Sequence, residues 1–347
     1  MTLLKPVVVP FEGPLTKGLF VRRTNRFTAH LMLDGIEVND GESGEVQAHC
    51  VNPGRMEAFV DAGATIWARR APEDGPKRKT DWTWELIEQD GVLCSTNTQR
   101  PNALMAAVLR EKALSGFTDY KSVKAEKVLP HEGPGTKSRC DFFVEENDGT
   151  EHWIEIKNCH ATYPDEELLR GWGYFPDSVS ERAARHCREL AVLAKRPNTK
   201  CTVIIIASRA DATAGIRPSD YHDPGFCAAA REAQRAGVVF RGLRATHTTE
   251  ATTVENEIPL DLSPPSAETL GALHRSWTAC APITGWDRTF GVPKRVANGP
   301  FAHNKGRAGC DSALEPITSE HFSPTVSRHF DDRTPKKRRR RSSKKKE

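Results

Sequence analysis

The chain has 347 residues, enough for two ordinary domains, and its 37% hydrophobic and 28% charged residues are typical of a soluble protein. No apolar run approaches the roughly 20 residues that a membrane span requires, so we expect neither a membrane segment nor a signal peptide. The nine cysteines are an odd number without a Cys-x-x-Cys pair. This pattern argues against a disulfide framework and against a zinc ribbon.

The net charge of +4 conceals an asymmetry along the chain. Residues 335–347 contain nine Lys or Arg and one Glu, and subtracting their +8 from the total leaves −4 for the rest. Any nucleic-acid affinity of the folded part must therefore come from local patches rather than from bulk charge.

Short β-prone runs separated by turn residues extend from residue 15 to residue 97 and predict a small OB-like β-barrel. We also expect one short helix at residues 55–60. The expected strands are residues 18–23, 26–33, 45–51, 64–70, 82–88 and 92–96.

Basic residues on the expected strands and loops of this barrel suit nucleic-acid binding. A basic loop leads directly into Trp82 and Trp84, and aromatic rings between cations are typical of surfaces that bind single strands. It is equally open that the tryptophans belong to the barrel core and that the arginines form a solvated rim. The candidate nucleic-acid residues of the barrel are Arg22, Arg23, Arg26, Lys77, Arg78 and Lys79.

Residues 98–262 alternate helical and β patterns and predict an α/β domain with a mixed sheet. Ser178-x-x-Glu181 predicts a capping box at the start of the second helix. The expected helices are residues 101–114, 178–195 and 225–236, and the expected strands, besides a central hairpin, are residues 120–129, 201–207 and 238–243.

The central hairpin is predicted by Asn147-Asp148-Gly149 between two apolar-rich runs. In a three-residue loop with Gly149 in the left-handed position, Phe142 faces Ile154 and Asp141 faces Glu155. Lys157 lies on the same face as Glu155, because side chains alternate along a strand.

Two carboxylates about 5 Å apart repel each other unless a cation lies between them, and hard oxygen ligands suit Mg²⁺ or Mn²⁺. We therefore predict that Asp141 and Glu155 bind the metal, with Glu126 of the preceding strand as a third carboxylate. Lys157 is the predicted group that orients water or stabilises charge. The alternative is that Glu-x-Lys is a solvated, mutually paired strand face.

After residue 262 the periodicity weakens, and Pro, Ser, Thr and Gly become frequent. We interpret residues 263–347 as mostly disordered, and the scattered Trp277, Trp286, Phe290 and Phe301 leave room for a segment that binds a partner. The basic run at its end indicates either nuclear import or a nucleic-acid patch, and we favour a nuclear location over a cytoplasmic one.

Short motifs in a fixed order make the chain resemble the sugar fermentation stimulation protein family over residues 15–262. They are Arg23-x-x-Arg26-Phe27, Cys50-x-Asn52-Pro53-Gly54-x-Met56, Lys77-Arg78-Lys79, Trp84-Glu85-Leu86, Asn97-Thr98-x-x-Pro101-Asn102, Ser138-Arg139-x-Asp141-Phe142, Glu155-Ile156-Lys157-Asn158, Gly173-Tyr174-Phe175-Pro176-Asp177-Ser178-Val179 and Glu181-Arg182 through His186. The order of Asp141 followed by Glu155-Ile156-Lys157 on the next strand also looks like the core of the PD-(D/E)xK nucleases.

The resemblance implies an OB-like domain (15–97) followed by a PD-(D/E)xK nuclease-like domain (98–262), with DNA binding as the activity. On the helix that follows, Arg182, Ser180 and His186 are candidate phosphate contacts, and the alternative for each is a surface or packing role. The connection after Glu-x-Lys looks longer than in the family and brings Asp165, Glu166 and Glu167 near the expected site.

The favoured function is Mg²⁺-dependent hydrolysis of nucleic acid, and the alternative is a DNA-binding regulator without catalysis. A sugar-metabolism enzyme finds no support, because the sequence has no Gly-rich nucleotide loop. Whether RNA replaces DNA as the partner, and which oligomer forms, stay open.

Overall fold

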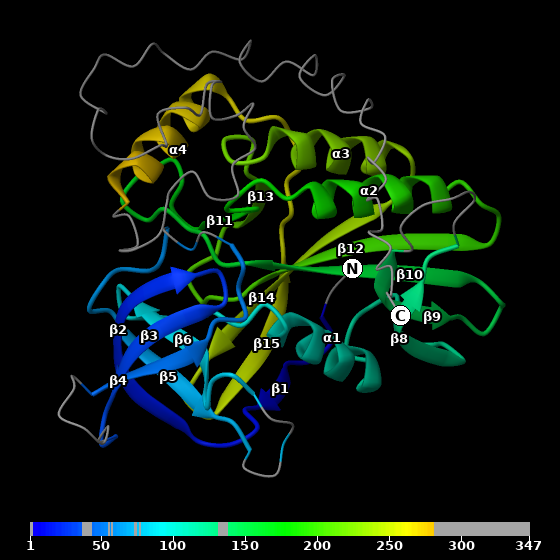
Figure 1. Cartoon of the computed structure of the whole chain (residues 1–347). Helices are drawn as coiled ribbons and strands as arrows, with labels where there is room; N and C mark the ends of the chain where they lie inside the picture. Colours follow the sequence, from blue (N-terminus) through cyan, green and yellow to red (C-terminus); the bar gives the residue numbers. More distant parts are fainter. Residues whose placement is uncertain are drawn as a thin grey trace, which may run out of the picture.

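The computed structural model describes residues 3–36, 44–54, 56, 58–72, 75, 78–130 and 138–280. They form a β-barrel beside a larger mixed sheet that is covered by helices on both faces (Figure 1). This arrangement confirms the predicted fold class, an OB-like barrel followed by a mixed-sheet domain.

The barrel has the strand order β4-β3-β2-β5-β6-β7, and a parallel pairing of β4 with β6 closes it. The segment after β4 contains no helix among its described residues, and Met56 has φ 62°, which an α-helix does not allow. The helix expected at 55–60 is therefore wrong. The strands are β2 (Leu15–Asn25), β3 (Thr28–Leu33), β4 (Glu45–His49), β5 (Thr65–Arg70), β6 (Trp82–Gln89) and β7 (Val92–Ser95).

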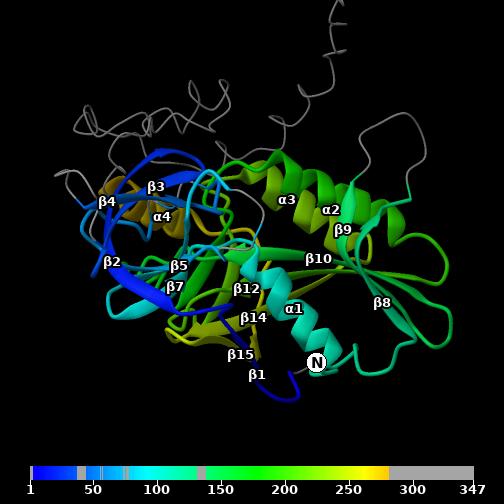
Figure 2. The same ribbon diagram turned by 60° about the horizontal axis from the view of Figure 1, so that its bottom comes forward.

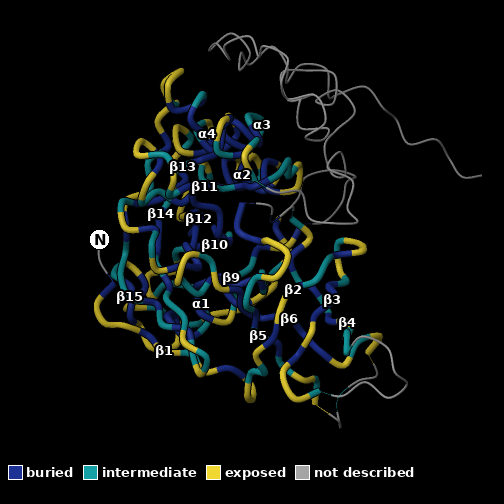
Figure 3. Tube along the Cα trace, turned by 90° about the vertical axis from the view of Figure 1, so that its left-hand side faces the viewer, coloured by how far each residue is buried: buried dark blue, intermediate teal, exposed yellow. Residues whose placement is uncertain are grey.

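The larger sheet has the order β1-β15-β14-β12-β10-β9-β8, with parallel pairing between β10, β12 and β14. The apolar run in β12 is buried on both faces, as expected of a central parallel strand (Figure 3). The strands are β1 (Val7–Pro10), β8 (Ser122–Val128), β9 (Arg139–Glu145), β10 (Glu151–Cys159), β12 (Thr199–Ala207), β14 (Val239–His247) and β15 (Ala251–Ile258).

Helix α1 (Arg100–Arg110) covers one face of this sheet, and α2 (Glu181–Leu193) and α3 (Pro224–Arg235) cover the other (Figures 1 and 2). The face under α1 is packed by Phe142, Val144, Ile154 and Ile156 together with apolar residues of α1. Phe142 and Ile154 are the pair that the predicted hairpin register places opposite each other, and Val144 and Ile156 lie two residues along the same strands, on the same face. None of the described helices is long and apolar enough to cross a membrane.

Five elements escape the sequence pattern: the strands β1 and β15, the short parallel pair β11 (Trp172–Phe175) and β13 (Gly215–Pro218), and helix α4 (Ala267–Ala279). Trp277 of α4 is 1% exposed and packs in a core cluster with Tyr163 and Tyr221. The predicted boundary at residue 262 therefore falls before the last packed helix, and Trp277 packs within its own chain. Trp286, Phe290 and Phe301, the other aromatic residues of the expected partner segment, lie outside the described residues.

The two domains meet at Asp177, which follows β11. Its carboxylate accepts hydrogen bonds from the backbone N–H of Met56 (3.0 Å) and from Nε2 of His160 (3.1 Å). A Cβ on Gly54 would lie 2.9 Å from the same carboxylate, so only glycine fits there. Although burial opposes the charged form, His160 and the Met56 N–H hold the pKa of Asp177 well below its usual range.

We expect Asp177→Asn to lower the free energy of unfolding at pH 7 by about 2 kcal/mol, because hydrogen bonds to a charged group are weakened. A depressed folded pKa stabilises the protein above the unfolded value of about 4, and this stabilisation is lost as pH falls through the folded value. The difference in unfolding free energy between the wild type and Asp177→Asn should therefore become smaller as the pH is lowered. Urea titrations at pH 7, 4 and 3 measure it, with Asp61→Asn, at an exposed position of the barrel, as control. A difference in unfolding free energy that does not change with pH contradicts the lowered pKa of Asp177.

Candidate metal and nucleic-acid sites

The β9–β10 hairpin has the predicted turn and register. Gly149 has φ 85°, and the backbone N–H of Glu146 donates to the carbonyl of Thr150 at 2.9 Å. Phe142 pairs with Ile154, which confirms the predicted register. The paired ladder ends there, so Asp141 and Glu155 are the next residues of the two strands.

Asp141 uses both carboxylate oxygens to connect three elements. Its Oδ2 accepts from the backbone N–H of Ile156 (2.7 Å). This N–H has no backbone partner on β9, because the pairing of β9 with β10 ends at Phe142 and Ile154. Its Oδ1 accepts from Nδ2 of Asn102 in the first turn of α1 (2.9 Å). Asn102 is a site residue to which the sequence assigned no role, although it ends one of the family motifs.

Glu155 is 3% exposed and lies between two basic side chains. Its Oε1 accepts hydrogen bonds from Nζ of Lys157 and from Nδ1 of His186 on α2. His186 is buried against this carboxylate, so the interpretation of His186 as a phosphate contact is not supported. Among the described residues, Oε2 of Glu155 has no hydrogen-bond partner.

The charges of these groups are coupled. Burial and the neighbouring Glu155 raise the pKa of Asp141. Burial also opposes ionisation of Glu155, but Lys157 and His186 outweigh it and lower the pKa of Glu155. Burial likewise opposes the charge on Lys157, yet the Glu155 carboxylate raises the pKa of Lys157. At neutral pH the site therefore holds a buried ion pair beside a carboxylate that its neighbour makes less acidic, and a bound cation relieves that repulsion.

Glu126 lies between the two β8 residues that pair with the neighbours of Asp141. Its side chain is exposed, however, and its backbone is left-handed, with φ 54°. Within the described ranges, no three His, Cys, Asp or Glu side chains are grouped closely enough to hold a metal. The site thus offers Asp141 and Glu155 as a pair, without a third acidic ligand in place.

The acidic residues of the connection after β10 do not join this pair. Glu166 forms a two-bond ion pair with Arg275 of α4, at 2.7 and 3.0 Å. Asp165 and Glu167 are exposed. The longer connection therefore serves as a contact for α4, and Glu166 is not a site residue.

Two of the predicted nucleic-acid residues have partners inside the barrel. Arg23 is fully buried, and its guanidinium donates to the carbonyls of Gly54, Arg26 and Asn52. It is a structural residue, so its predicted contact with nucleic acid is wrong. Arg22 forms two hydrogen bonds with Glu45, at 2.5 and 2.6 Å, which neutralise its charge.

The tryptophans belong to the barrel core, where Trp82 and Trp84 pack with Phe20. Of the two interpretations left open, the structure thus selects the core for these rings. Arg26 is half-buried.

The remaining candidates differ in position. Arg78, Lys79 and Arg182 are exposed, whereas Lys77 lies outside the described residues. Ser180 is the N-cap of α2, and its Oγ accepts from the backbone N–H of Ala183. The helix begins two residues later than the capping box at Ser178 predicts, and the Ser180 hydroxyl is used by the helix.

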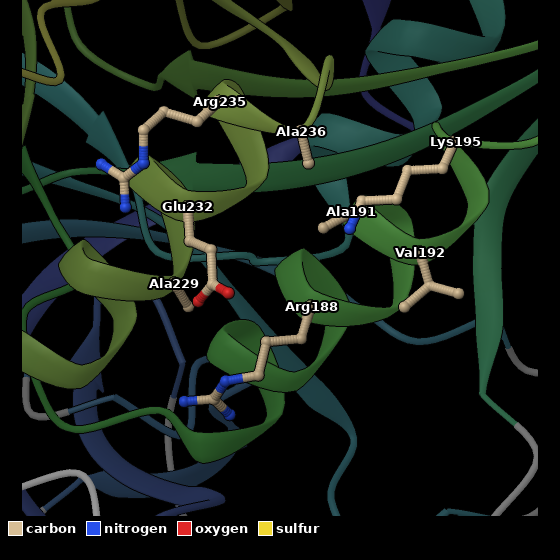
Figure 4. Close-up of a pocket in the computed structure, with 8 residues that line it drawn as sticks. All are labelled: Arg188, Ala191, Val192, Lys195, Ala229, Glu232, Arg235 and Ala236. Carbon is tan, nitrogen blue, oxygen red and sulfur yellow. The ribbon is translucent and has the colours of Figure 1, made fainter.

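A groove of about 410 Å³ lies between α2 and α3 (Figure 4). Arg188, Lys195 and Arg235 surround it together with Glu232. None of the Asp141, Glu155 or Lys157 side chains lines it, so it is separate from the candidate metal site.

Two family models together match most of the described chain. The model described as SfsA N-terminal OB domain matches residues 21–96, and the one described as Sugar fermentation stimulation protein RE domain matches residues 99–251. In structure, the chain is similar to SfsA from Pyrococcus furiosus in complex with Ca²⁺, with a TM-score of 0.60 and 21% identity over 75% of this chain and 99% of that chain.

Curated relatives show the same likeness in sequence. A sugar fermentation stimulation protein homolog from Jannaschia sp. is 33% identical over 255 residues, which cover 73% of this chain and 98% of the relative. A homolog from Caulobacter vibrioides is 34% identical over 225 residues, or 65% of this chain and 85% of the relative. These relatives are bacterial, and bacteria have no nucleus, so the predicted nuclear location is wrong. The basic run that suggested it lies outside the described residues. The chain belongs to the sugar fermentation stimulation protein family.

Proposed function

We propose that this protein binds DNA and hydrolyses its phosphodiester bonds with the help of a divalent metal, Mg²⁺ or Mn²⁺. The observation that carries the proposal is the meeting of Asp141, Glu155 and Lys157 where the β9–β10 ladder ends. Two acidic side chains and one ammonium group held at the end of a buried hairpin are costly for stability, since burial opposes each charge. Such an arrangement is typical of a functional site.

The available oxygens fit a magnesium-type ion. Mg²⁺ is usually held by one or two carboxylates together with water and substrate phosphate, so the pair of Asp141 and Glu155 suffices without a third acid. Burial and the neighbouring Glu155 raise the pKa of Asp141, and a cation would relieve the repulsion between the two carboxylates. The Oε2 of Glu155, which has no partner among the described residues, also favours a cation. When bound, the ion lowers the pKa of a coordinated water and neutralises phosphate charge.

The protein groups have separate tasks in this proposal. Asn102 and the Ile156 N–H fix the orientation of Asp141, and His186 fixes that of Glu155. Lys157, held by Glu155 in its charged form, stabilises the negative charge that develops on the phosphate oxygens or orients the attacking water. Exposed cations, among them Arg78, Lys79 and Arg182, provide electrostatic attraction for the DNA backbone.

A cleavage assay tests the proposal. Single-stranded, duplex and mismatched DNA are incubated with the full chain in Mg²⁺, Mn²⁺ or EDTA, and the products are separated on denaturing gels. We expect shortened products only when a metal is present. DNA binding without cleavage on any of these forms favours the alternative, a DNA-binding regulator that keeps the fold without the chemistry.

Metal binding is measured independently of cleavage by the stability of the protein. With free Mg²⁺ at 100 times its dissociation constant, the wild type should gain about 2.7 kcal/mol of unfolding free energy. Asp141→Asn and Glu155→Gln should lose most of this gain, because each removes a charged ligand. Thermal unfolding with and without Mg²⁺ or Mn²⁺ is the measurement.

Two matched variants control this experiment. Glu145→Gln removes a carboxylate from the same strand as Asp141, at the hairpin end, and should respond to metal like the wild type. Glu126→Gln tests whether Glu126 is a third metal ligand or only an exposed side chain. Because Glu126 is exposed, we expect this variant to retain most of the metal response. A full response of Asp141→Asn contradicts the metal site.

A further inference from the structure

The groove between α2 and α3 is a surface that the proposed chemistry does not use. It lies in the helical layer on the face of the sheet opposite α1 (Figures 2 and 4). Residues three or four positions apart on a helix share one side of it, so Arg188, Val192 and Lys195 of α2 line the groove together. Glu232 and Ala236 of α3 line it from the other side. One stripe of residues from each helix thus forms its walls.

Three cations at this groove have no anionic partner. Among the described residues, the side chains of Arg188, Lys195 and Arg235 form no ion pair and no hydrogen bond, and all three are exposed. Arg231, one turn earlier on α3, differs, because it forms two hydrogen bonds of 2.7 Å with a neighbouring aspartate. A single glutamate is the only acidic residue among those that line the groove. Three cations less one anion leave a surplus of two positive charges.

The ends of the two helices account for part of this charge. The last residue of α3 is Arg235, and Lys195 follows the C-cap of α2 at Ala194. Cations at these positions are stabilised by the helix dipole, whatever else they do. Arg188 lies in the middle of α2, where the dipole has no such effect. The dipole therefore does not explain why an unpaired cation lies there beside the other two.

The chemistry of the groove suits phosphates rather than bases. Its lining residues include no aromatic ring on which a base could stack. Arg188 and Lys195 are seven residues apart, roughly 10 Å along the helix, or about three steps of a DNA strand. With the exposed Arg182 near the start of α2, the cations of this helix extend over roughly 20 Å, or about six base pairs. Cations fixed along a straight helix match the regular phosphates of a duplex.

Helix α2 also connects the groove to the candidate metal site. Nδ1 of His186 bonds Oε1 of Glu155, and Arg188 follows two residues later. The distance along the helix from His186 to Lys195 is roughly 14 Å, or about four base pairs. A duplex that follows α2 from the metal pair therefore reaches the groove within half a helical turn of DNA.

We propose that the α2–α3 groove binds the phosphate backbone of duplex DNA beside the cleavage site, with Arg188, Lys195 and Arg235 each contacting a phosphate. This inference rests on the proposed function for its choice of DNA. It adds the form of the substrate, a duplex, and its path along α2. Because the contacts are to phosphates alone, they provide affinity and position without a base preference.

Fluorescence anisotropy tests the groove with a labelled duplex of about 24 base pairs, in EDTA so that no cleavage occurs. Replacing Arg188, Lys195 and Arg235 together by glutamine should weaken binding at least about tenfold at low salt. The salt slope should fall by up to about one unit for each cation removed. A single-stranded oligonucleotide of the same length should lose less affinity. An equal or larger loss for the single strand overturns the choice of a duplex.

Two further variants make the result specific. Glu232→Gln removes the anion from the groove, so it should bind the duplex more tightly than the wild type, a gain that poor folding cannot produce. Arg110→Gln is the matched control, because Arg110 is an exposed cation in the last turn of α1, on the opposite face of the sheet. It should leave affinity and salt slope unchanged. Unchanged affinity of the triple variant, or an equal loss per cation in Arg110→Gln, overturns the proposal.

The outcome is separate from that of the catalytic site. The triple variant should keep the full stabilisation by Mg²⁺, because none of its residues lies at the β9–β10 ladder. If the wild type cleaves no DNA but the triple variant still loses duplex affinity, the proposed chemistry fails and the binding surface stands. If cleavage occurs and the triple variant binds the duplex like the wild type, the binding surface fails alone. If the wild type binds no duplex even at low salt, both proposals fail.

Discussion

Replacing Lys157 by methionine should slow DNA cleavage about 100- to 1000-fold, the usual cost of removing one group that stabilises transition-state charge. Methionine keeps the length of the side chain but carries no charge. Affinity for DNA should fall much less, because one cation among several phosphate contacts is lost. Single-turnover cleavage in Mg²⁺ and binding in EDTA measure the two effects separately.

Lys200 provides the matched control for this variant. It lies on β12 and pairs with Glu146 at 2.6 Å, at the hairpin end of the same sheet. Lys200→Met also breaks a lysine–glutamate pair, yet it should leave cleavage unchanged. If Lys157→Met is unstable, Glu155→Gln with the lysine retained provides the second test. Equal rates in wild type and Lys157→Met would show that the lysine only balances the charge of Glu155.

The site was predictable where its geometry is local. The turn at Gly149 fixes the register of β9 against β10, and that register alone places Asp141 beside Glu155. Its supporting residues were not predictable in the same way. Asn102 and His186 reach the site from α1 and α2, on opposite faces of the sheet, and no local pattern specifies which helix residue meets a given strand position.

The fold, like the site, was predictable where a local pattern specifies the element and not where distant contacts do. Strands with clear alternation and a buried parallel strand were recognisable from the sequence, because both patterns reflect which faces are covered. The four-residue strands β1, β11 and β13 were missed, since so short a run carries little periodicity, and the eight-residue edge-side strand β15 was missed as well. Helix α4 was missed because its stability depends on tertiary contacts, such as that of Trp277 with the cluster around Tyr163.

The roles of aromatic and basic residues could not be assigned from residue type alone. Trp84 and Phe27 are both aromatic residues of the barrel, yet one is fully buried and the other is exposed. Arg22 and Arg23 are consecutive, so they point to opposite faces of β2, and only one of them is at the surface. A shift of one residue in a strand exchanges core and surface, which the charge pattern does not reveal.

Arg23→Met should lower the free energy of unfolding by roughly 3–5 kcal/mol, because it leaves three carbonyls of the barrel without their donor in a buried position. These are the carbonyls of Arg26, Asn52 and Gly54, which the guanidinium bonds at 2.8, 2.9 and 3.0 Å. The loss should also weaken the hydrogen bond from the Met56 N–H to Asp177 of the other domain. Urea unfolding measures the change in free energy.

Arg22→Met is the control, since it removes the same charge from the neighbouring position. Its ion pair with Glu45 is partly exposed, so we expect a change within about 1 kcal/mol. Under conditions where both variants are folded, neither should change the salt slope of DNA binding, because the charge of Arg22 is neutralised and that of Arg23 is buried. A reduced slope for Arg23→Met would mean that the segment holding this side chain opens when DNA binds and presents the guanidinium to a phosphate.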